Sequence, residues 1–353
     1  MTRPVRLAVL GAGLIGRRHI AHVAAEPMAE LAAVVDPSPA GEQAAHAHGT
    51  RRFASFADLM ASDRPDGVII ATPNQMHVAN GLESIAAGVP ALVEKPIADD
   101  VASATRLVDA AEAAGVPLLV GHHRRHNPMI QAARQAIDAG RLGTVVAVHG
   151  ICWFFKPDDY FDVAWRRDKG AGPVFLNLIH DVDNLRYLCG DVAAVHALES
   201  NAVRGYAVEE TTVILLRFLS GVLATVTVSD TIVAPWSWEL TAGENPAYHQ
   251  TDQSCYQVGG THASLTIPHL ELWRNPDRRS WWEPLARERL ACVPEDPLRL
   301  QVRHFCRVIR GEEEPLVSGR EGLATLRVIE AVKRSAATGE MVHLQGGRAP
   351  VMA

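Results

Sequence analysis

One lysine in the chain has the surroundings of a group that could handle a proton. Lys95 closes the apolar run ALVEKPIA (91–98), with Glu94 before it and Pro96 after it. Apolar runs more often end in Gly, Asn or Asp, because those residues turn the chain cheaply. A lysine at a strand end can be a solvated edge residue, or it can be a positioned cation whose pKa falls on partial desolvation. In the second case it could accept a proton or stabilise a developing alkoxide.

A set of glycines has the spacing of a dinucleotide-binding loop. The apolar run 5–10 is followed by GAGLIG, which places Gly11, Gly13 and Gly16 in the order G-x-G-x-x-G. Gly11 would permit a tight turn, Gly13 a close approach of the pyrophosphate, and Gly16 close packing of the next helix on the strand. The phosphates would then lie at the N-terminus of that helix, where free N–H groups favour anions.

An acidic residue follows at the distance that this motif requires. Asp36 ends the apolar run 30–36, 20 residues after Gly16. Its carboxylate can accept two hydrogen bonds from a ribose diol and would repel a 2′-phosphate. The next residues, 37–39, are Pro, Ser and Pro, so no arginine stands there to capture such a phosphate. The sequence therefore predicts NAD, with NADP possible only if a basic residue folds nearby, the candidates being Arg17, Arg18, Arg51 and Arg52.

The surrounding elements predict the fold that positions these residues. Strand-like runs alternate with helical patterns, the strands at 66–72, 89–95 and 116–121 and the helices at 74–88 and 99–115. Such alternation indicates a doubly wound parallel sheet, whose ligands bind at the carboxyl ends of its strands. Three stretches that follow strands should therefore share one edge with the glycine loop, namely ATPN (71–74), EKP (94–96) and GHHRRHNP (121–128).

These pieces together resemble the Gfo/Idh/MocA family of nicotinamide-dependent oxidoreductases, which includes glucose–fructose oxidoreductase and inositol dehydrogenases. The resemblance is carried, in the family order, by GAGLIGRRH, ATPNQMH, EKP, GHHRRHNP, AWRRDKGAGP and NLIHDVDNLRYL. It implies an N-terminal Rossmann domain, placed at 1–123. It also implies a C-terminal α+β domain for substrate binding and oligomerisation, placed at 124–353, with a large, mostly antiparallel sheet.

The second half of the sequence agrees with that architecture. Strand-like runs stand at 144–155, 193–200, 210–219 and 221–230, and helical patterns at 175–189, 297–310 and 319–338. The two late helices could pack back on the first domain. Several apolar residues fall on the face of strands 193–230 that should be open, and such a face needs cover. Since the family often forms its oligomer interface on this sheet, we expect a homodimer or homotetramer.

The resemblance places the catalytic lysine at Lys95 and adds a second proton-handling residue. His180 matches the histidine of an Asp-x-x-x-His pattern at the start of a helix that faces the nicotinamide. The aspartate has no match, because Leu176 stands four residues before His180. Asn177, three residues before His180, would share its helix face and could hydrogen-bond a substrate hydroxyl without taking its proton. Lys95 and His180 are then expected to share the proton.

Other residues near these motifs have two interpretations. Asp181 and Asp183 could orient His180, or they could be solvated or lie at an interface. His77 matches a family position near the cofactor, or it is a histidine on a helix surface. The residues expected to contact the cofactor come from the glycine loop and from the segments that follow the strands. They are Gly11, Gly13, Leu14, Ile15, Gly16, Asp36, Thr72, Pro73, Asn74, His77, Glu94, Lys95 and Arg125.

Three residues of the second domain are expected to contact the substrate along with Asn177. Trp165 and Arg166 match a Trp-Arg pair that often lies over the substrate in the family, and Lys156 could project towards the same pocket. The alternatives are a core tryptophan and exposed basic side chains.

The histidine-rich stretch 122–126 looks at first like a metal site. Adjacent histidines on an extended stretch point in opposite directions, and no carboxylate–histidine set at metal spacing accompanies them. We therefore predict no metal. Arg125 in this stretch is expected to reach the cofactor or the neighbouring loop.

Composition narrows the remaining classes of function. The 353 residues are 48% hydrophobic and carry a net charge of −6 without a long Lys/Arg tract. This argues against nucleic acid or an anionic membrane as the main partner. The apolar runs are shorter than the ~20 residues of a membrane helix. The five cysteines include no CxxC pair, which indicates reduced thiols in a cytoplasmic protein.

The sequence thus favours an NAD-dependent dehydrogenase that acts on a secondary alcohol of a sugar, cyclitol or related polyol. An NADPH-dependent keto-sugar reductase or a dihydrodiol dehydrogenase is the alternative among enzymes. A non-catalytic sensor of the NAD redox ratio is the alternative of another class, which the presence of both Lys95 and His180 disfavours. Substrate specificity is expected to lie in the loops 156–172 and 231–262, where no motif can be interpreted.

Overall fold

The computed structural model describes residues 3–344. The chain forms two compact units, which are described here one at a time. The first comprises the chain up to His126 together with Glu295–Leu326, and the second comprises Asn127–Pro294 together with the chain from Arg327 onward. Helix α10 (Gly319–Thr338) contributes residues to both. The first unit thus includes helix α9 (Pro297–Ile309), which lies far along the sequence.

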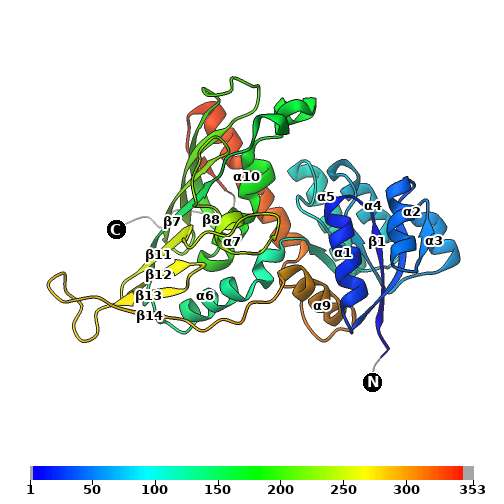
Figure 1. The fold of residues 1–353 in the computed structure, drawn as a ribbon, viewed down its shortest axis with the longest axis horizontal. Coiled ribbons are helices and arrows are strands. Elements are labelled where there is room, and N and C mark those ends of the chain that lie inside the picture. Colours follow the sequence, from blue (N-terminus) through cyan, green and yellow to red (C-terminus); the bar gives the residue numbers. More distant parts are fainter. Residues whose placement is uncertain (1–2, 345–353) are drawn as a thin grey trace. The chain divides into compact units, whose positions relative to one another are not determined.

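A six-stranded sheet, parallel throughout, forms the centre of the first unit (Figure 1). Its strand order is β3-β2-β1-β4-β5-β6, the order of a Rossmann fold. The neighbours β1 and β4 mark the point at which the order reverses, where such sheets bind nucleotides. The predicted doubly wound sheet is confirmed, and its strands are β1 (Val5–Leu10), β2 (Ala29–Val35), β3 (Arg51–Phe53), β4 (Gly67–Ile70), β5 (Ala91–Val93) and β6 (Leu118–Val120).

Both faces of this sheet are covered. Every residue of β4, β5 and β6 is buried. One set of alternating side chains, including Val9 and Leu92, packs with α1 (Leu14–Ala25), α9 and α2 (Pro39–Ala47). Because successive side chains of a strand point to opposite faces, the burial of the others requires a second layer of helices. The remaining helices of the unit are α3 (Phe56–Ser62), α4 (Asn74–Ala86), α5 (Val101–Ala114) and the short 3₁₀ helix η1 (His123–His126).

Several of these helices start or stop at residues suited to that position. The Ser55 side chain accepts a hydrogen bond from the Asp58 backbone N–H at the start of α3. Asp100 does the same for Ser103 at the start of α5, and Gly115 ends that helix in the left-handed conformation with φ 62°. These caps satisfy backbone groups that the helix itself leaves without partners at its ends.

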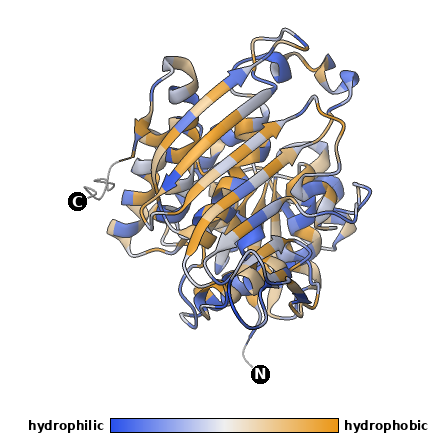
Figure 2. Ribbon diagram, turned by 90° about the vertical axis from the view of Figure 1, so that its left-hand side faces the viewer, coloured by the Kyte–Doolittle hydropathy of each residue, from blue (hydrophilic) through white to orange (hydrophobic). Residues whose placement is uncertain are grey.

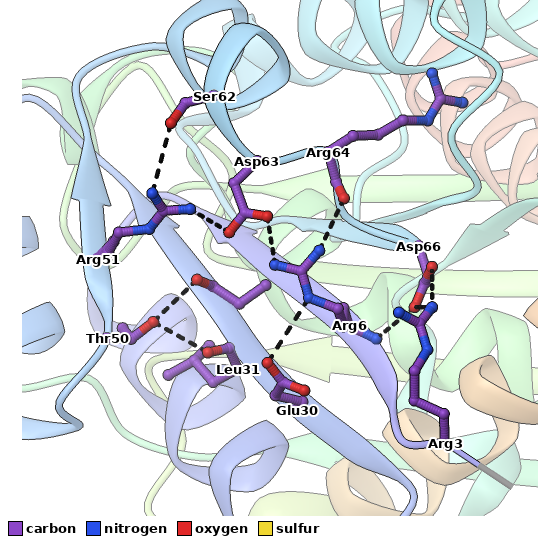
Figure 3. Close-up of polar contacts among 11 residues, drawn as sticks. Arg3, Arg6, Glu30, Leu31, Thr50, Arg51, Ser62, Asp63, Arg64 and Asp66 are labelled. Atoms are coloured by element: carbon purple, nitrogen blue, oxygen red, sulfur yellow. Dashed lines mark hydrogen bonds and ion pairs between the residues drawn. The ribbon is translucent and has the colours of Figure 1, made fainter.

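Ion pairs join the strands at the edge opposite the expected site (Figure 3). Arg6 on β1 lies 2.5 Å from Asp63 in the segment before β4, and Asp63 also pairs with Arg51 of β3. Arg3 reaches Asp66 at 2.9 Å. These side chains are partly exposed, so each pair contributes at most about 1 kcal/mol to stability.

The second unit is built on a nine-stranded sheet with the order β14-β13-β12-β11-β7-β10-β9-β8-β15. Strands β7 and β10 pair in parallel, and the other pairs are antiparallel. This confirms the expected mostly antiparallel sheet. Its strands are β7 (Val145–Trp153), β8 (Val192–Ser200), β9 (Thr211–Phe218), β10 (Leu223–Ser229), β11 (Tyr256–Gly260), β12 (Ala263–Ile267), β13 (Glu271–Arg274), β14 (Ala286–Arg289) and β15 (Val342–His343).

One face of the nine-stranded sheet is buried and the other is open. On β9 the even-numbered residues from Thr212 to Phe218 are buried, whereas Val213 and Leu215 are 47% and 51% exposed. The buried face packs on α6 (Pro128–Asp138), α7 (Ile179–Cys189) and the second half of α10. Figure 2 shows that the strands carry apolar residues along much of their length.

The structure differs from the predicted elements of this unit in several places, and helix α6 and strand β15 are among the elements that were not predicted. The helix predicted at 175–189 begins as a π-helical turn, η4 (Val174–Leu178), and only then continues as α7. Strands β11 to β14 occupy a region in which the sequence predicted no elements. The short helices of the unit are η2 (Asp158–Asp162), η3 (Ala164–Arg167) and α8 (Trp238–Thr241). Within residues 3–344, every helix is too short or too polar to cross a lipid bilayer.

Candidate active site

The glycine loop between β1 and α1 has three positions that need glycine for different reasons. Gly11 has φ 92°, and a Cβ there would lie 2.6 Å from the carbonyl oxygen of Ala71. A Cβ on Gly16 would overlap with the carbonyl of Gly11, so α1 can approach β1 only because that position has no side chain. A Cβ on Gly13 would have no atom within 4 Å. The open space at Gly13, at the first turn of α1, fits the pyrophosphate of a dinucleotide.

The carboxylate of Asp36 follows β2 and is fastened to this loop. It accepts hydrogen bonds from the backbone N–H groups of Ala12, at 2.7 Å, and Ser38, at 2.8 Å. Burial on its own would raise the pKa of Asp36, but these hydrogen bonds outweigh it and hold the pKa below its usual range. Since each carboxylate oxygen has two lone pairs, the group can still accept from a ribose diol.

Among the arginines that could capture a 2′-phosphate, Arg52 is hydrogen-bonded to the backbone of Asp36. Its guanidinium donates to the backbone carbonyl oxygens of Asp36, at 2.8 Å, and Pro37, at 2.6 Å. Its neighbour Arg51 turns to Asp63 instead. A cation therefore does lie beside the segment that follows β2, and it comes from β3, a strand that the sequence analysis did not identify.

His77 joins two of the loops at the carboxyl edge of the sheet. Its Nε2 lies 2.9 Å from the carbonyl oxygen of Thr72, which follows β4, and its Nδ1 lies 2.8 Å from that of Pro96, which follows β5. The side chain is 1% exposed, so it is not a histidine on a helix surface. Pro73 follows Thr72 as the N-cap of α4, and Asn74 is the first residue of that helix. His77 therefore ties the expected cofactor loop 72–74 to the EKP segment.

Glu94 is a buried carboxylate with two donors. His19 Nε2 lies 2.6 Å from its Oε1, and the Lys95 backbone N–H donates to its Oε2 at 3.2 Å. Burial on its own would raise the pKa of Glu94, but the hydrogen bond with His19 and the charges of His19, His123 and Lys95 lower it to about 2. Sequence reasoning missed His19, although it stands three residues after Gly16 on α1 and closes the GAGLIGRRH motif.

Lys95 follows the end of β5 and is partly buried, next to a cis Lys95–Pro96 peptide bond. It therefore lies at the same edge of the sheet as the glycine loop and Asp36. A lysine in this position is neither a fully solvated edge residue nor a core residue. It has the partial desolvation that makes an ammonium useful for proton exchange.

Arg125, expected at the cofactor, forms an ion pair with Glu321 of α10 at 2.9 Å and is itself buried. In the same 3₁₀ helix, the His126 ring packs on that of His304, with centroids 5.0 Å apart. The part of the chain that the structure describes holds no group of three or more His, Cys, Asp or Glu side chains with the geometry of a metal site.

In the second unit, His180 and Asn177 lie on either side of a change in helix type. Asn177 belongs to the π-helical turn η4, and His180 to the first turn of α7. A π turn alters the phase of side chains along a helix and is frequent at functional sites. His180 is 7% exposed. The buried Asn177 Oδ1 has no hydrogen-bond partner within residues 3–344, so it remains available to a ligand.

The two aspartates after His180 are not solvated. Asp181 and Asp183 are each 1% exposed. Asp181 accepts a short hydrogen bond from the hydroxyl of Tyr256 on β11, and the Tyr256 ring stacks on Trp238 at 5.9 Å. Asp181 therefore anchors α7 to the sheet.

The expected substrate contacts of the second unit differ in their surroundings. Lys156 is 8% exposed, and its Nζ lies 3.1 Å from Asp230. Burial lowers the pKa of Lys156, and the charge of Asp230 opposes that only in part. Arg166 stacks on the ring of Tyr160 at 4.1 Å. Trp165 is 52% exposed, so it is not a core tryptophan.

The residues thus form two groups. The glycine loop, Asp36, the loop 72–74, Glu94 and Lys95 all belong to the carboxyl edge of the six-stranded sheet. His180, Asn177 and the residues around Lys156 belong to the second unit. The approach of His180 to Lys95 stays a prediction.

Comparisons with known proteins identify relatives of the chain. Residues 5–122 match an oxidoreductase family with an NAD-binding Rossmann fold, and residues 130–266 match the GFO/IDH/MocA C-terminal domain. The chain is 30% identical to a D-apiose dehydrogenase of Paraburkholderia graminis, over 96% of this chain and 89% of that protein. It is 28% identical to an inositol 2-dehydrogenase of Rhizobium meliloti, over 96% and 99%. The WlbA dehydrogenase of Bordetella pertussis, solved with NADH and UDP-GlcNAcA, has a TM-score of 0.77 and 27% identity, covering 97% of this chain and 99% of that one.

Proposed function

Because the chain belongs to the Gfo/Idh/MocA family of NAD(P)-dependent oxidoreductases, we propose that it is an NAD-dependent dehydrogenase of a secondary alcohol in a sugar, cyclitol or related polyol. The observation that carries the proposal is the position of Lys95. It stands at the sheet edge that also holds the glycine loop and Asp36, beside the buried carboxylate of Glu94. A redox sensor would need the loop and Asp36 but not a lysine at this edge of the sheet.

The dinucleotide, when bound, supplies the hydride acceptor. Lys95 takes the proton of the substrate hydroxyl, directly or with His180, and in the opposite direction returns it. While the ammonium is charged it also stabilises the alkoxide that develops as the hydride leaves. Asn177 donates or accepts a hydrogen bond to a neighbouring hydroxyl and orients the ring, since an amide cannot take the proton.

Asp36 supports NAD as the cofactor. Its low pKa keeps it ionised at neutral pH, and a charged carboxylate both accepts from the ribose hydroxyls and repels a 2′-phosphate. Arg52 supports a second candidate, an NADPH-dependent reductase of a keto-sugar. The guanidinium lies against the backbone of Asp36 and Pro37, and a guanidinium beside the segment that follows β2 is the kind of group that holds a phosphate.

The names of the relatives define the substrate class to test. The relatives are named as a D-apiose dehydrogenase and inositol 2-dehydrogenases, so sugars and cyclitols are the compounds to test first. The decisive experiment is a panel of aldoses, cyclitols and sugar acids with NAD and NADP, followed by NADH or NADPH absorbance. Turnover of one substrate class with NAD supports the proposal. Tight NADH binding without turnover on any of them would favour the sensor.

The open face of the nine-stranded sheet supports a homodimer or homotetramer. Its exposed apolar side chains include Val213 and Leu215 on β9 and Leu223 on β10, 47%, 51% and 56% exposed. The same face contains a hollow of about 530 Å³ lined partly by Leu215 and Leu223. Apolar surface of this extent on a sheet is rarely left in water. A second copy of the chain, bringing the same face, would cover it symmetrically.

A further inference from the structure

We propose that His19 is a positioning residue for the reaction, which holds Glu94 ionised and fixed beside Lys95. The inference rests on the proposed function, since it assumes that Lys95 handles the proton. His19 is a buried residue of α1, the helix that follows the glycine loop, and it acts on the reaction only through Glu94.

The first argument is burial. His19 is 0% exposed and Glu94 is 5% exposed, and their ring nitrogen and carboxylate oxygen are 2.6 Å apart. An ionised carboxylate can only accept hydrogen bonds, so the His19 Nε2 must donate. A short hydrogen bond between two fully buried groups from α1 and the end of β5 fixes both side chains against rotation.

The second argument is steric. A Cβ on Gly121 would lie 2.8 to 2.9 Å from the carboxylate atoms of Glu94. The carboxylate therefore has room only because residue 121 carries no side chain. With its second oxygen on the Lys95 backbone N–H, the group has one position available.

The third argument is electrostatic. A buried carboxyl without donors takes up a proton, because burial disfavours the charged form. The groups that oppose this at Glu94 are His19 on α1, His123 on η1 and Lys95 itself, and the hydrogen bond with His19 is the largest of the favourable effects. His19 thus makes the largest contribution to keeping Glu94 charged, and a charged Glu94 stabilises the ammonium of its neighbour Lys95.

The consequence is that loss of the His19 donor should act on the proton step and spare the cofactor. In His19→Leu the carboxyl of Glu94 becomes neutral, so the Lys95 ammonium loses a negative neighbour. We expect kcat to fall roughly 10- to 100-fold, which is the range typical of residues that orient a functional side chain through a hydrogen bond. The acidic limb of the pH–rate profile for alcohol oxidation follows the deprotonation of Lys95, so it should move to lower pH as the pKa of Lys95 falls. The dissociation constant of NADH should stay within about twofold.

Conservative and matched variants separate this role from a packing role. His19→Gln keeps an N–H donor and should recover most of kcat. Gly121→Ala places a Cβ against the carboxylate of Glu94 and should resemble His19→Leu. His22→Gln is the control, because His22 lies one turn further along α1 and pairs with Asp296 at 3.4 Å. A normal kcat and pH profile in His19→Leu would overturn the proposal, as would an equal loss in His22→Gln.

A measurement without substrate provides an independent test. NMR of glutamate labelled at the carboxyl carbon, assigned by Glu94→Gln, should show Glu94 ionised at neutral pH in the native protein and protonated in His19→Leu. A Glu94 signal that stays ionised in His19→Leu would overturn the inference. Lys95→Ala distinguishes it from the proposed function. An active Lys95→Ala enzyme refutes the catalytic lysine itself, whereas an inactive one beside a fully active His19→Leu refutes only the role of His19.

Discussion

The carboxylate of Asp36 accepts a 2.7 Å hydrogen bond from the backbone N–H of Ala12, so the residue that should hold the ribose is fastened to the loop that should hold the phosphates. Movement of either would therefore disturb the other. Together with the hydrogen bonds from Ser38, it holds the pKa of Asp36 below its usual range although the carboxyl is partly buried.

The first prediction concerns the choice of cofactor. We expect kcat/KM to be higher with NAD than with NADP. Asp36→Ala should narrow that ratio by at least about tenfold, because it removes both the ribose acceptor and the charge that repels a 2′-phosphate. The companion variant Arg52→Ala tests the alternative. A native enzyme that prefers NADP, and loses that preference in Arg52→Ala, would contradict the role given to Asp36.

The second prediction separates two glycines of one motif. Gly13→Ala should leave the free energy of unfolding nearly unchanged, because its Cβ meets no protein atom, yet weaken NADH binding by about tenfold or more. Gly16→Ala should lower the free energy of unfolding by roughly 1–3 kcal/mol, because its Cβ would overlap with the Gly11 carbonyl. Urea unfolding and NADH fluorescence titrations measure the two effects. Similar stability losses in both variants would rule out the open space at Gly13.

The third prediction concerns proton transfer. Lys95→Ala should lower kcat on a confirmed substrate by roughly 10²–10⁴ and leave NADH affinity largely intact. His180→Ala should also lower kcat. If the two residues act as a unit, the double variant should lose less than the product of the single losses. A near-normal kcat in Lys95→Ala would mean that the lysine has only a structural role.

The fourth prediction concerns assembly. The native protein should be a dimer or tetramer at micromolar concentration in light scattering. Leu215→Glu should shift it towards the monomer, because it places a charge in the centre of the open apolar face. Leu198→Glu, at the edge of the same face on β8, is a graded comparison and should have a smaller effect. A native protein with the molar mass of a monomer in light scattering would contradict the proposal that a second copy covers the open face.

Much of this protein followed from the sequence because its signals are local. The Gly11, Gly13 and Gly16 spacing, Asp36 at the end of a strand and the alternation of strands and helices depend on short-range sterics and periodicity, and they indicated the Rossmann sheet. The apolar run 210–219 likewise indicated the strand that became β9. Helix phase was less certain, since the π-helical turn before His180 has no signature in the letters Val174–Leu178.

Other features were decided only when distant segments met in the tertiary structure. His19 and Glu94 are 75 positions apart, and nothing in either neighbourhood specifies that they share a hydrogen bond. His77 acquired two backbone carbonyls as partners, and Arg52 came to lie beside Asp36 through the pairing of β2 with β3. Burial and long-range pairing determine the charge state and the orientation of a side chain, and neither quantity is written in the residues next to it.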